Sequence, residues 1–342
     1  MKLKSIIAAA VLSAVGTFAS AQTHDLKIAT FVTPKHGMSK WIDGWAASLE
    51  EKSEGRLKFE ILHGAQMGPP PAYYDLASNG QADITWVLHG ATPGRFKLTE
   101  ISNMPYLFCS AEQATRVLND PSVRALTDPE HRGVKVLTTF MHPPGQINMK
   151  GGPVLALSDL EGKAMRPPSK TVGQLIAMLG GKPVGLPPTA MAEALQKGTI
   201  DGTMIDYGGA GLAFQLGPFL TDITEVYAYT SSFALVMNPD SFGDLPADLQ
   251  AMVDESLVGI SPQIGQIWDK LDAIGKDVLT KAGVNIHTLS DEETAKFQAV
   301  GAAQTARYLA SLNDAGLPGD DVMAAIKAAI EVVGPVGPGC QS

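Results

Sequence analysis

Apolar residues follow two different periodicities along this chain, and the two periodicities alternate. Stretches with an apolar residue at every second position predict strands, and stretches with apolar residues three or four positions apart predict helices. The first elements predicted in this way are strands at 26–32, 57–61, 82–87 and 134–140, and helices over 41–49, before 79 and after 110. This alternation indicates an α/β domain with a largely parallel sheet.

The alternation starts again near Gln146 and predicts a second α/β unit. Its strands are expected from 146 and at 163–166 and 199–205, and its helices at 171–179 and 189–197. A further strand is expected at 233–237. The pattern then becomes helical from Ala247 to about Ala282, and two closing helices follow. A helical stretch of that length exceeds the usual globular helix, so we expect it to bridge two domains. No flexible linker separates the two units, which favours several short crossings over a single hinge.

Three serines predict helix starts, because each is followed three positions later by Gln or Glu in the arrangement called a capping box. They are Ser110, Ser158 and Ser290. Each serine is therefore expected to precede the first turn of a helix.

Length and composition exclude several classes of protein. The 342 residues provide room for two domains, and 45% apolar with 18% charged residues fits neither a disordered chain nor a coiled coil. The net charge is −9, and no run of basic residues interrupts the acidic balance. Nucleic acids and anionic membrane surfaces are therefore not expected as partners.

Residues 1–21 have the composition of a signal peptide. Lys2 and Lys4 precede an apolar stretch at 6–18, and Ala19-Ser20-Ala21 provides the small residues at which a signal peptidase cuts. The alternative, a membrane anchor or a buried first helix, agrees less well with so short an apolar run. We therefore expect an exported, soluble, periplasmic protein, cleaved near Ala21 and without direct lipid insertion.

Motifs for catalysis or metal binding are absent from the sequence. The histidines are scattered, no metal-ligand spacing occurs, and neither a nucleophile elbow nor a nucleotide-binding glycine loop is present. No cofactor and no metal are therefore predicted. Cys109 and Cys340 lie far apart in the sequence, which leaves open whether they pair, although export would permit a disulfide.

The stretch DLEGKAMRPPS at 159–169 places a cation at the end of an expected strand, directly before two prolines. Proline fixes its own φ and favours extended backbone in the preceding residue, so Arg166 should be held in a fixed direction. A planar guanidinium is suited to binding a carboxylate through two parallel hydrogen bonds. From the residues alone, Arg166 is either a carboxylate-binding residue or one partner of a surface or interdomain salt bridge.

The same stretch resembles the "DLKGLKIR" segment of the solute-binding subunits of tripartite ATP-independent periplasmic (TRAP) transporters. Further segments resemble that family in the same order along the chain: ASNGQADITWV at 77–87, TPGRF and SNMPYLF within 92–108, LGGKPVGLPPTAMAEALQKGTIDG at 179–202, and FALVMNPDSFGDLP at 233–246. Each segment alone is weakly specific, but their common order supports the resemblance.

The resemblance implies an α/β fold of two lobes, with two mixed sheets, multiple interlobe crossings and a long bridging helix. The first lobe is expected to contain residues 22–143 and about 233–272, and the second to contain 144–232 and about 273–342. A ligand would lie between the lobes, and closure would remove water and strengthen an ion pair there. On this resemblance, Arg166 binds the ligand's carboxylate.

Some members of the family, including sialic-acid binders, carry a second arginine upstream of the first, where this chain has MHPPGQINMK at 141–150. That stretch resembles a variant from a branch associated with simpler organic acids, which argues against a sialic acid. Either His142 or Gln146 donates to the other end of the ligand, or this stretch is only a proline-fixed turn. Tyr207 either contacts the ligand or packs in the core. Asp206 in the cleft would repel a second carboxylate, unless it bonds to a ligand hydroxyl or lies outside the cleft.

Other candidate ligand contacts follow from position. Trp86 and His89 follow the C-terminal end of an expected strand, where open α/β sheets place ligands, and Phe31 and His36 follow the first strand in the same way. Asn238 matches an asparagine of the family motif, but an asparagine before proline is also a helix N-cap signature. It therefore either contacts the ligand or caps the next helix.

Together these observations predict a monomeric periplasmic solute-binding protein that delivers an organic acid to TRAP transporter membrane subunits. The expected ligand is a small aromatic or hydroxylated monocarboxylate, and after it a C4-type dicarboxylate. The alternatives are a periplasmic enzyme acting on organic acids, which lacks a recognisable nucleophile or metal site, and an adhesion or scaffold protein, which would not respond to small molecules.

Overall fold

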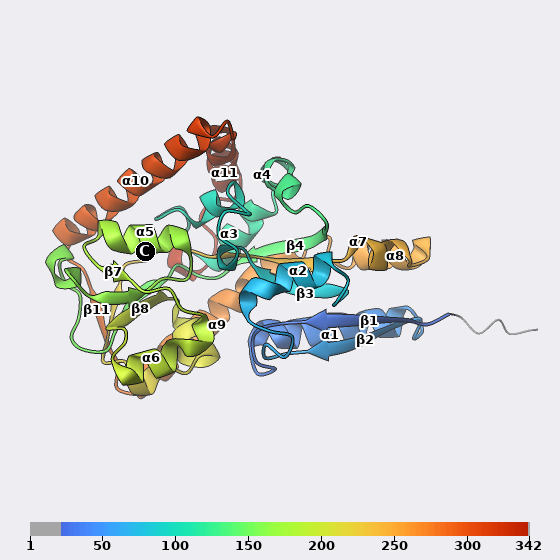
Figure 1. The fold of residues 1–342 in the computed structure, drawn as a ribbon, viewed down its shortest axis with the longest axis horizontal. Coiled ribbons are helices and arrows are strands. Elements are labelled where there is room, and N and C mark those ends of the chain that lie inside the picture. Colours follow the sequence, from blue (N-terminus) through green and yellow to red (C-terminus); the bar gives the residue numbers. More distant parts are fainter. Residues whose placement is uncertain (1–21, 341–342) are drawn as a thin grey trace, which may run out of the picture.

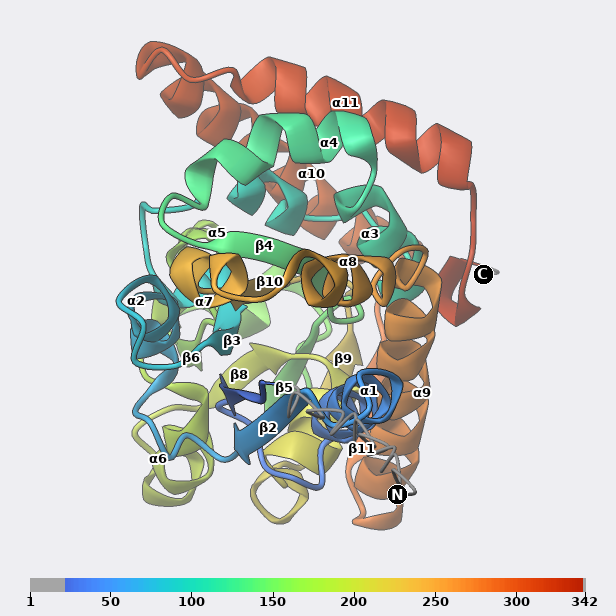
Figure 2. The same ribbon diagram turned by 90° about the vertical axis from the view of Figure 1, so that its right-hand side faces the viewer.

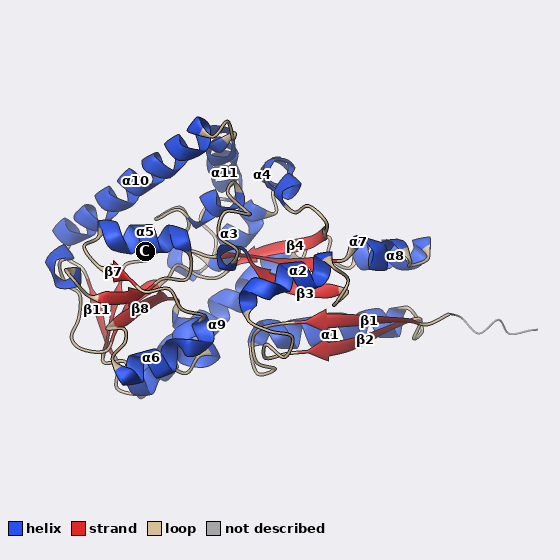
Figure 3. Cartoon of the chain, viewed as in Figure 1, coloured by secondary structure: helices blue, strands red, loops and turns tan. Residues whose placement is uncertain are grey.

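Two β-sheets form the centres of two lobes, with helices around each of them (Figure 1, Figure 3). The computed structural model describes residues 22–340, so the predicted signal peptide lies outside the described residues. The first sheet has the order β2-β1-β3-β10-β4. Its strands are β1 (His24–Ala29), β2 (Leu57–Leu62), β3 (Ile84–Leu88), β4 (Lys135–Met141) and β10 (Ser232–Met237).

The second sheet has the order β11-β9-β5-β8-β6-β7. Its strands are β5 (Gln146–Met149), β6 (Ala164–Arg166), β7 (Lys182–Pro183), β8 (Gly202–Ile205), β9 (Asp222–Glu225) and β11 (Asn285–Thr288). In each sheet one strand runs against its neighbours: β10 is antiparallel to β3 and β4, and β5 is antiparallel to β8 and β9. The two mixed sheets confirm the architecture that the family resemblance implies. In the first sheet, β2, β1 and β3 pair in parallel as expected from periodicity, and β4 runs in the same direction. The exception is β10, which enters this sheet from a distant part of the chain.

The described helices cover the sheets and connect the lobes. They are α1 (Gly37–Lys52), α2 (Tyr73–Ser78), α3 (Ala111–Leu118), α4 (Pro121–Thr127), α5 (Lys170–Met178), α6 (Met191–Lys197), α7 (Pro239–Gly243), α8 (Ala247–Glu255), α9 (Ser261–Lys281), α10 (Asp291–Asp314) and α11 (Gly319–Val333). None of the described helices is long and apolar enough to cross a membrane.

Helix α9 is the bridge between the lobes: it lies between the two sheets in Figure 1, and it is seen along its length at the right of Figure 2. Its Trp268 belongs to the buried core of the first lobe, and its Leu279 belongs to that of the second. The sequence pattern predicted one helical stretch from Ala247 to about Ala282, but the structure has two helices there, α8 and α9, with a short non-helical segment between them. The segment between the two helices contains Gly259, whose φ of +69° is not helical. Pro262 lies in the first turn of α9, where a backbone N–H has no partner within the helix, so its absence costs no hydrogen bond.

Two of the three predicted helix caps are present. The side-chain oxygens of Ser110 and Ser290 accept hydrogen bonds from backbone N–H groups at 3.0 and 3.3 Å. The expectation for Ser158 is wrong, because only a short 3₁₀ turn at Leu157–Leu160 forms there. The carboxylate of Asp159 instead accepts the backbone N–H groups of Leu155 and Ala156 at 2.8 and 2.9 Å.

The C-terminal segment is shared between the lobes, although residues 273–342 were expected in the second lobe. Helix α10 packs against α5, and Phe297 joins the core of the second lobe. Helix α11 returns to the first lobe, where Val322 and Ile326 share a buried cluster with Val117 of α3. The apolar face of α11 therefore completes the helix layer over α3 and α4.

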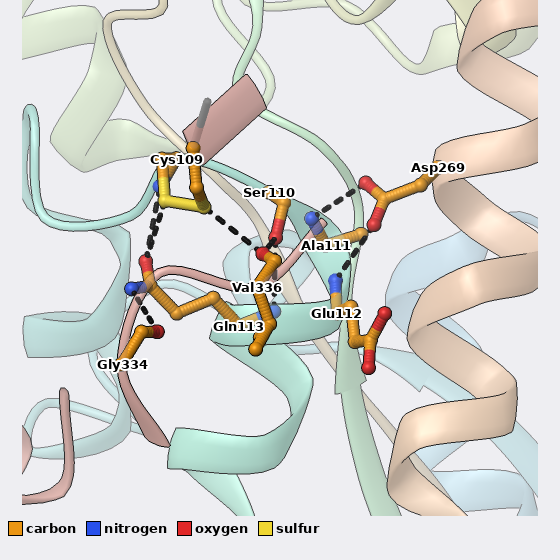
Figure 4. The surroundings of a disulfide bond; sticks show 9 residues. Cys109, Ser110, Ala111, Glu112, Gln113, Asp269, Gly334 and Val336 are labelled. Carbon is orange, nitrogen blue, oxygen red and sulfur yellow. Dashed lines mark hydrogen bonds between the residues drawn. A yellow bond between two sulfur atoms is a disulfide. The ribbon is translucent and has the colours of Figure 1, made fainter. Parts of the chain in front are cut away.

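Cys109 and Cys340 form a disulfide, which answers the question that the sequence left open (Figure 4). Hydrogen bonds surround it: Ser110 Oγ donates to the Val336 carbonyl, and Gln113 Nε2 donates to the Gly334 carbonyl at 2.9 Å. The C-terminal tail is thereby attached to the start of α3.

Candidate functional site

A small cavity lies between the two lobes, at the edge where strands of both sheets end. Phe31 follows β1 and Leu88 ends β3 in the first lobe, while Arg166 ends β6 and Asp206 follows β8 in the second. The carboxyl ends of strands are where open α/β sheets bind ligands. The free volume of the cavity is about 60 Å³, so the lobes lie close together in this structure.

Arg166 provides the positive charge of the cavity. Its side chain is only 3% exposed, and its Nε donates to the Leu186 carbonyl at 3.3 Å. Among residues 22–340, no carboxylate forms an ion pair with it, and neither terminal nitrogen has a hydrogen-bond partner. The salt-bridge alternative for Arg166 therefore has no support in the structure.

The charge state of Arg166 follows from its surroundings. Burial lowers the pKa of the guanidinium to about 10, and the neighbouring Tyr229 opposes that shift. The side chain consequently remains protonated at neutral pH. An unpaired buried charge is costly for a folded protein, and it is tolerated where a ligand supplies the missing partner.

Aromatic side chains form the wall opposite the strand ends of the second lobe. The ring of Trp86 lies 5.0 Å from that of Phe31, and the ring of Trp268 stacks on Phe233 at 5.5 Å, centroid to centroid. Trp86 and Trp268 meet edge to face at 6.1 Å. The indole N–H groups of both tryptophans lack a hydrogen-bond partner in the described part of the chain. The wall therefore combines flat apolar surfaces with two unsatisfied donors.

His36 contributes a neutral imidazole to this wall. Burial lowers its pKa to about 4, so the ring carries no charge at neutral pH. Its Nδ1 accepts the Met38 backbone N–H at 3.2 Å, which places the ring hydrogen on Nε2. His142 has the opposite arrangement, because its Nδ1 donates to the Pro143 carbonyl at 2.5 Å. The cavity is thus lined by two histidines of different hydrogen-bonding character.

Five of the nine residues predicted from the sequence line this cavity. They are Phe31, His36, Trp86, His142 and Arg166. The structure brings them together, although they are up to 135 positions apart: Trp86 lies within β3, Arg166 ends β6, and the other three lie in segments after β1 and β4. That they contact a ligand remains a proposal.

The other four lie outside the cavity, where each has a structural partner. Asn238 caps α7 by accepting the Asp240 and Ser241 N–H groups at 3.0 and 2.9 Å. His89 is fully buried between Ser232 and His131, Gln146 accepts two backbone N–H groups at 226 and 227, and Tyr207 donates to Glu225 at 3.0 Å. The contact of Asn238 is the helix cap that was its structural alternative. The polar side-chain groups of the other three residues are likewise engaged by the protein itself.

Four aromatic lining residues were not predicted from the sequence: Phe214, Tyr229, Phe233 and Trp268. Phe233 lies on β10, and Trp268 lies on α9, far along the chain from the other lining residues. Tyr229 lies on a crossing between the lobes, and its hydroxyl donates to the Met204 carbonyl at 2.9 Å. Their only sequence signal is that they are aromatic, which many core residues share.

A wider groove adjoins the cavity on the side of Arg166. Its volume is about 660 Å³, and prolines from both lobes line it, among them Pro69 to Pro71 and Pro187. Arg166 and Pro168 border both spaces. The groove therefore gives a ligand a path to Arg166 from solvent. No group of three or more potential metal ligands was found within residues 22–340.

Comparison with known proteins agrees with this geometry. The model of the bacterial extracellular solute-binding proteins, family 7 (DctP), matches residues 28–311. A solute-binding protein of Albidiferax ferrireducens is 28% identical over 299 residues, which cover 82% of this chain and 86% of that protein.

Two crystal structures are similar over nearly their whole length. A TRAP solute-binding protein from a marine metagenome, specific for aromatic acid ligands and co-crystallised with 3-hydroxybenzoate, is 29% identical with a TM-score of 0.87, covering 91% of this chain and 99% of that one. A TRAP solute-binding protein of Rhodoferax ferrireducens in complex with copurified benzoate is 28% identical with a TM-score of 0.86, covering 91% and 98%.

Proposed function

Since this chain belongs to family 7 of the bacterial extracellular solute-binding proteins, we propose that it binds an aromatic monocarboxylate between its lobes. Members of this family are periplasmic and work with TRAP membrane components in transport, and they are not enzymes. For this chain we propose export with cleavage near Ala21, a monomeric state, and delivery of the acid to TRAP membrane subunits.

The observation that carries the ligand class is the unpaired guanidinium of Arg166 inside the cavity. A carboxylate would supply the partner that the described residues do not, and the low dielectric of a closed cleft would strengthen the pair. The unpaired indole N–H groups of Trp86 and Trp268 are further donors beside the cavity. All three groups favour a ligand that accepts hydrogen bonds.

The body of the ligand is proposed to be a single aromatic ring. The cavity is small, and flat rings border it, so a planar ligand can make offset or edge-to-face contacts with them. The carboxylate of Asp206 in the same lining disfavours a C4-type dicarboxylate, whose second charge it would repel. Two similar proteins bind benzoate and 3-hydroxybenzoate, which supports this choice.

A thermal unfolding experiment tests the proposal. Benzoate and 3-hydroxybenzoate at a hundred times their Kd should each stabilise the purified mature protein by about 2.7 kcal/mol. Succinate, glucose and benzylamine should give smaller or no shifts, and mass spectrometry should recover the bound acid chemically unchanged. A response to sugars or amines but not to the aromatic acids would contradict the proposal.

Closure of the lobes should depend on Gly90. A Cβ atom at this position in the first lobe would lie 2.6 Å from the Cβ of Ser169, which caps α5 in the second lobe. Gly90→Ala should therefore hold the lobes apart and weaken benzoate binding about fivefold to tenfold, a loss of about 1 kcal/mol measured by calorimetry. Gly44→Ala is the matched control, because a Cβ atom there meets no other atom within 4 Å. Equal affinities for both variants would show that this contact does not limit closure.

A further inference from the structure

Asp206 is the negatively charged counterpart of Arg166 in the cavity lining. It directly follows β8, and its side chain is buried. One carboxylate oxygen, Oδ2, accepts the Gly209 N–H at 2.9 Å. The other, Oδ1, lies 3.8 Å from His142 Nδ1, and that nitrogen already donates to the Pro143 carbonyl. In the described structure, Oδ1 therefore has no hydrogen-bond donor within bonding distance.

The local backbone leaves this oxygen uncovered. Gly209 begins a π-helical turn at Gly209–Ala213, and a Cβ atom there would lie only 2.8 Å from Oδ1. A Cβ atom at Gly208 would lie 3.2 Å from Oδ2. Two consecutive glycines thus permit the backbone to approach the carboxylate without a side chain between them.

A second carboxylate, that of Asp272, lies within electrostatic reach of Asp206. Burial is the main cause of a pKa of Asp272 far above its usual range, and the charge of Asp206 raises it further. Asp272 does not border the cavity, and its Oδ1 accepts the Gly208 N–H at 3.0 Å. Of these two carboxylates, only that of Asp206 borders the cavity and can meet a ligand there.

Arg166 and Asp206 border one cavity but do not pair with each other. The charges of both residues influence the pKa of the Tyr229 phenol, which burial raises most. The charge of Asp206 raises this pKa further, and the charge of Arg166 lowers it. The cavity therefore has a cationic and an anionic pole with a tyrosine within electrostatic reach of each. A ligand with a carboxylate at one end and a hydrogen-bond donor at the other would satisfy both poles.

We propose that Asp206 is the specificity-determining residue of this site, with its Oδ1 accepting a hydrogen bond from a hydroxyl group on the ring of an aromatic acid. This inference rests on the proposed function and adds to it a preference for hydroxylated acids over the parent acid. A hydrogen bond to a charged acceptor is among the stronger ones in proteins. At least one of 3-hydroxybenzoate and 4-hydroxybenzoate should therefore bind about tenfold or more tightly than benzoate.

Calorimetry of the mature protein with four ligands tests the inference: benzoate, 3-hydroxybenzoate, 4-hydroxybenzoate and 3-methoxybenzoate. In the unmodified protein, 3-methoxybenzoate should gain nothing over benzoate, because its oxygen cannot donate. In Asp206→Asn the advantage of the hydroxylated acid should fall to about twofold or less, whereas Asp272→Asn should keep it, because Asp272 does not border the cavity.

Three results would overturn the inference. The first is equal affinity of the unmodified protein for benzoate and both hydroxybenzoates. This result needs no variant, so the inference can be tested even if Asp206→Asn fails to fold. The second is an unchanged preference of folded Asp206→Asn for the hydroxylated acid over benzoate, which would overturn the inference but not the proposed function. Absence of binding of all four acids to the unmodified protein would refute the proposed function, and the inference with it.

Discussion

Replacing Arg166 by methionine should weaken the binding of aromatic acids at least thirtyfold. Loss of one partner from a buried, hydrogen-bonded charge pair costs about 2–5 kcal/mol, which is about 30-fold to several thousandfold in Kd. Methionine retains much of the side-chain length but removes the charge, so the variant isolates the ion pair from cavity filling. Titration calorimetry with 3-hydroxybenzoate measures the loss.

The same variant separates a binding role from a structural role. Arg166 has no carboxylate partner among the described residues, so removing its buried charge should leave the unliganded protein as stable as before or more stable. Arg166→Lys is the matched control: it keeps the charge but lacks the planar fork, and it should bind with intermediate affinity. A methionine variant with unchanged affinity, or one that unfolds without ligand, would contradict the role assigned to Arg166.

Removing the disulfide should produce the largest loss of stability. Cys109 and Cys340 are separated by 231 positions, so their bond closes most of the mature chain into one loop. Removal of a native disulfide typically costs about 2–5 kcal/mol, mainly because the unfolded chain gains freedom. The double variant Cys109→Ser, Cys340→Ser should show this loss in equilibrium unfolding by guanidinium chloride.

Ligand affinity should be almost unaffected in that variant, because neither cysteine borders the cavity between the lobes. Reduction of the unmodified protein should reproduce the loss of stability, whereas the same reductant should not change the double variant. If the double variant and the oxidised protein unfold at the same guanidinium concentration, the disulfide does not stabilise the fold.

The sequence pattern predicted those strands and helices that contain several apolar residues, whether one face or both faces are buried. Strand β2 alternates as expected at Leu57, Phe59 and Ile61, and α6 ends at Gly198, which has the left-handed φ of +71°. Strands β9 and β11 were missed because they are short and largely polar, with few apolar positions to reveal a period. Their pairing depends on neighbours that lie far away in the sequence.

The site was predictable only where local sequence determines geometry. Arg166 could be identified because a strand end and two prolines fix its direction, and the family resemblance indicated its role. Asn238 could not be assigned, since a helix cap and a ligand contact require the same residue type before proline. Trp268 was missed because its helix reaches the cavity only through the packing of α9 across both lobes. Such placement depends on tertiary structure, which local patterns do not contain.

A crystal structure of the protein with 3-hydroxybenzoate is the most direct test of the central claim that Arg166 anchors a carboxylate between the lobes. The account predicts both carboxylate oxygens within hydrogen-bond distance of the terminal nitrogens of Arg166, with the ring against Trp86 and Trp268. A bound acid whose carboxylate contacts other groups, with Arg166 left unpaired or turned toward a protein carboxylate, would contradict it.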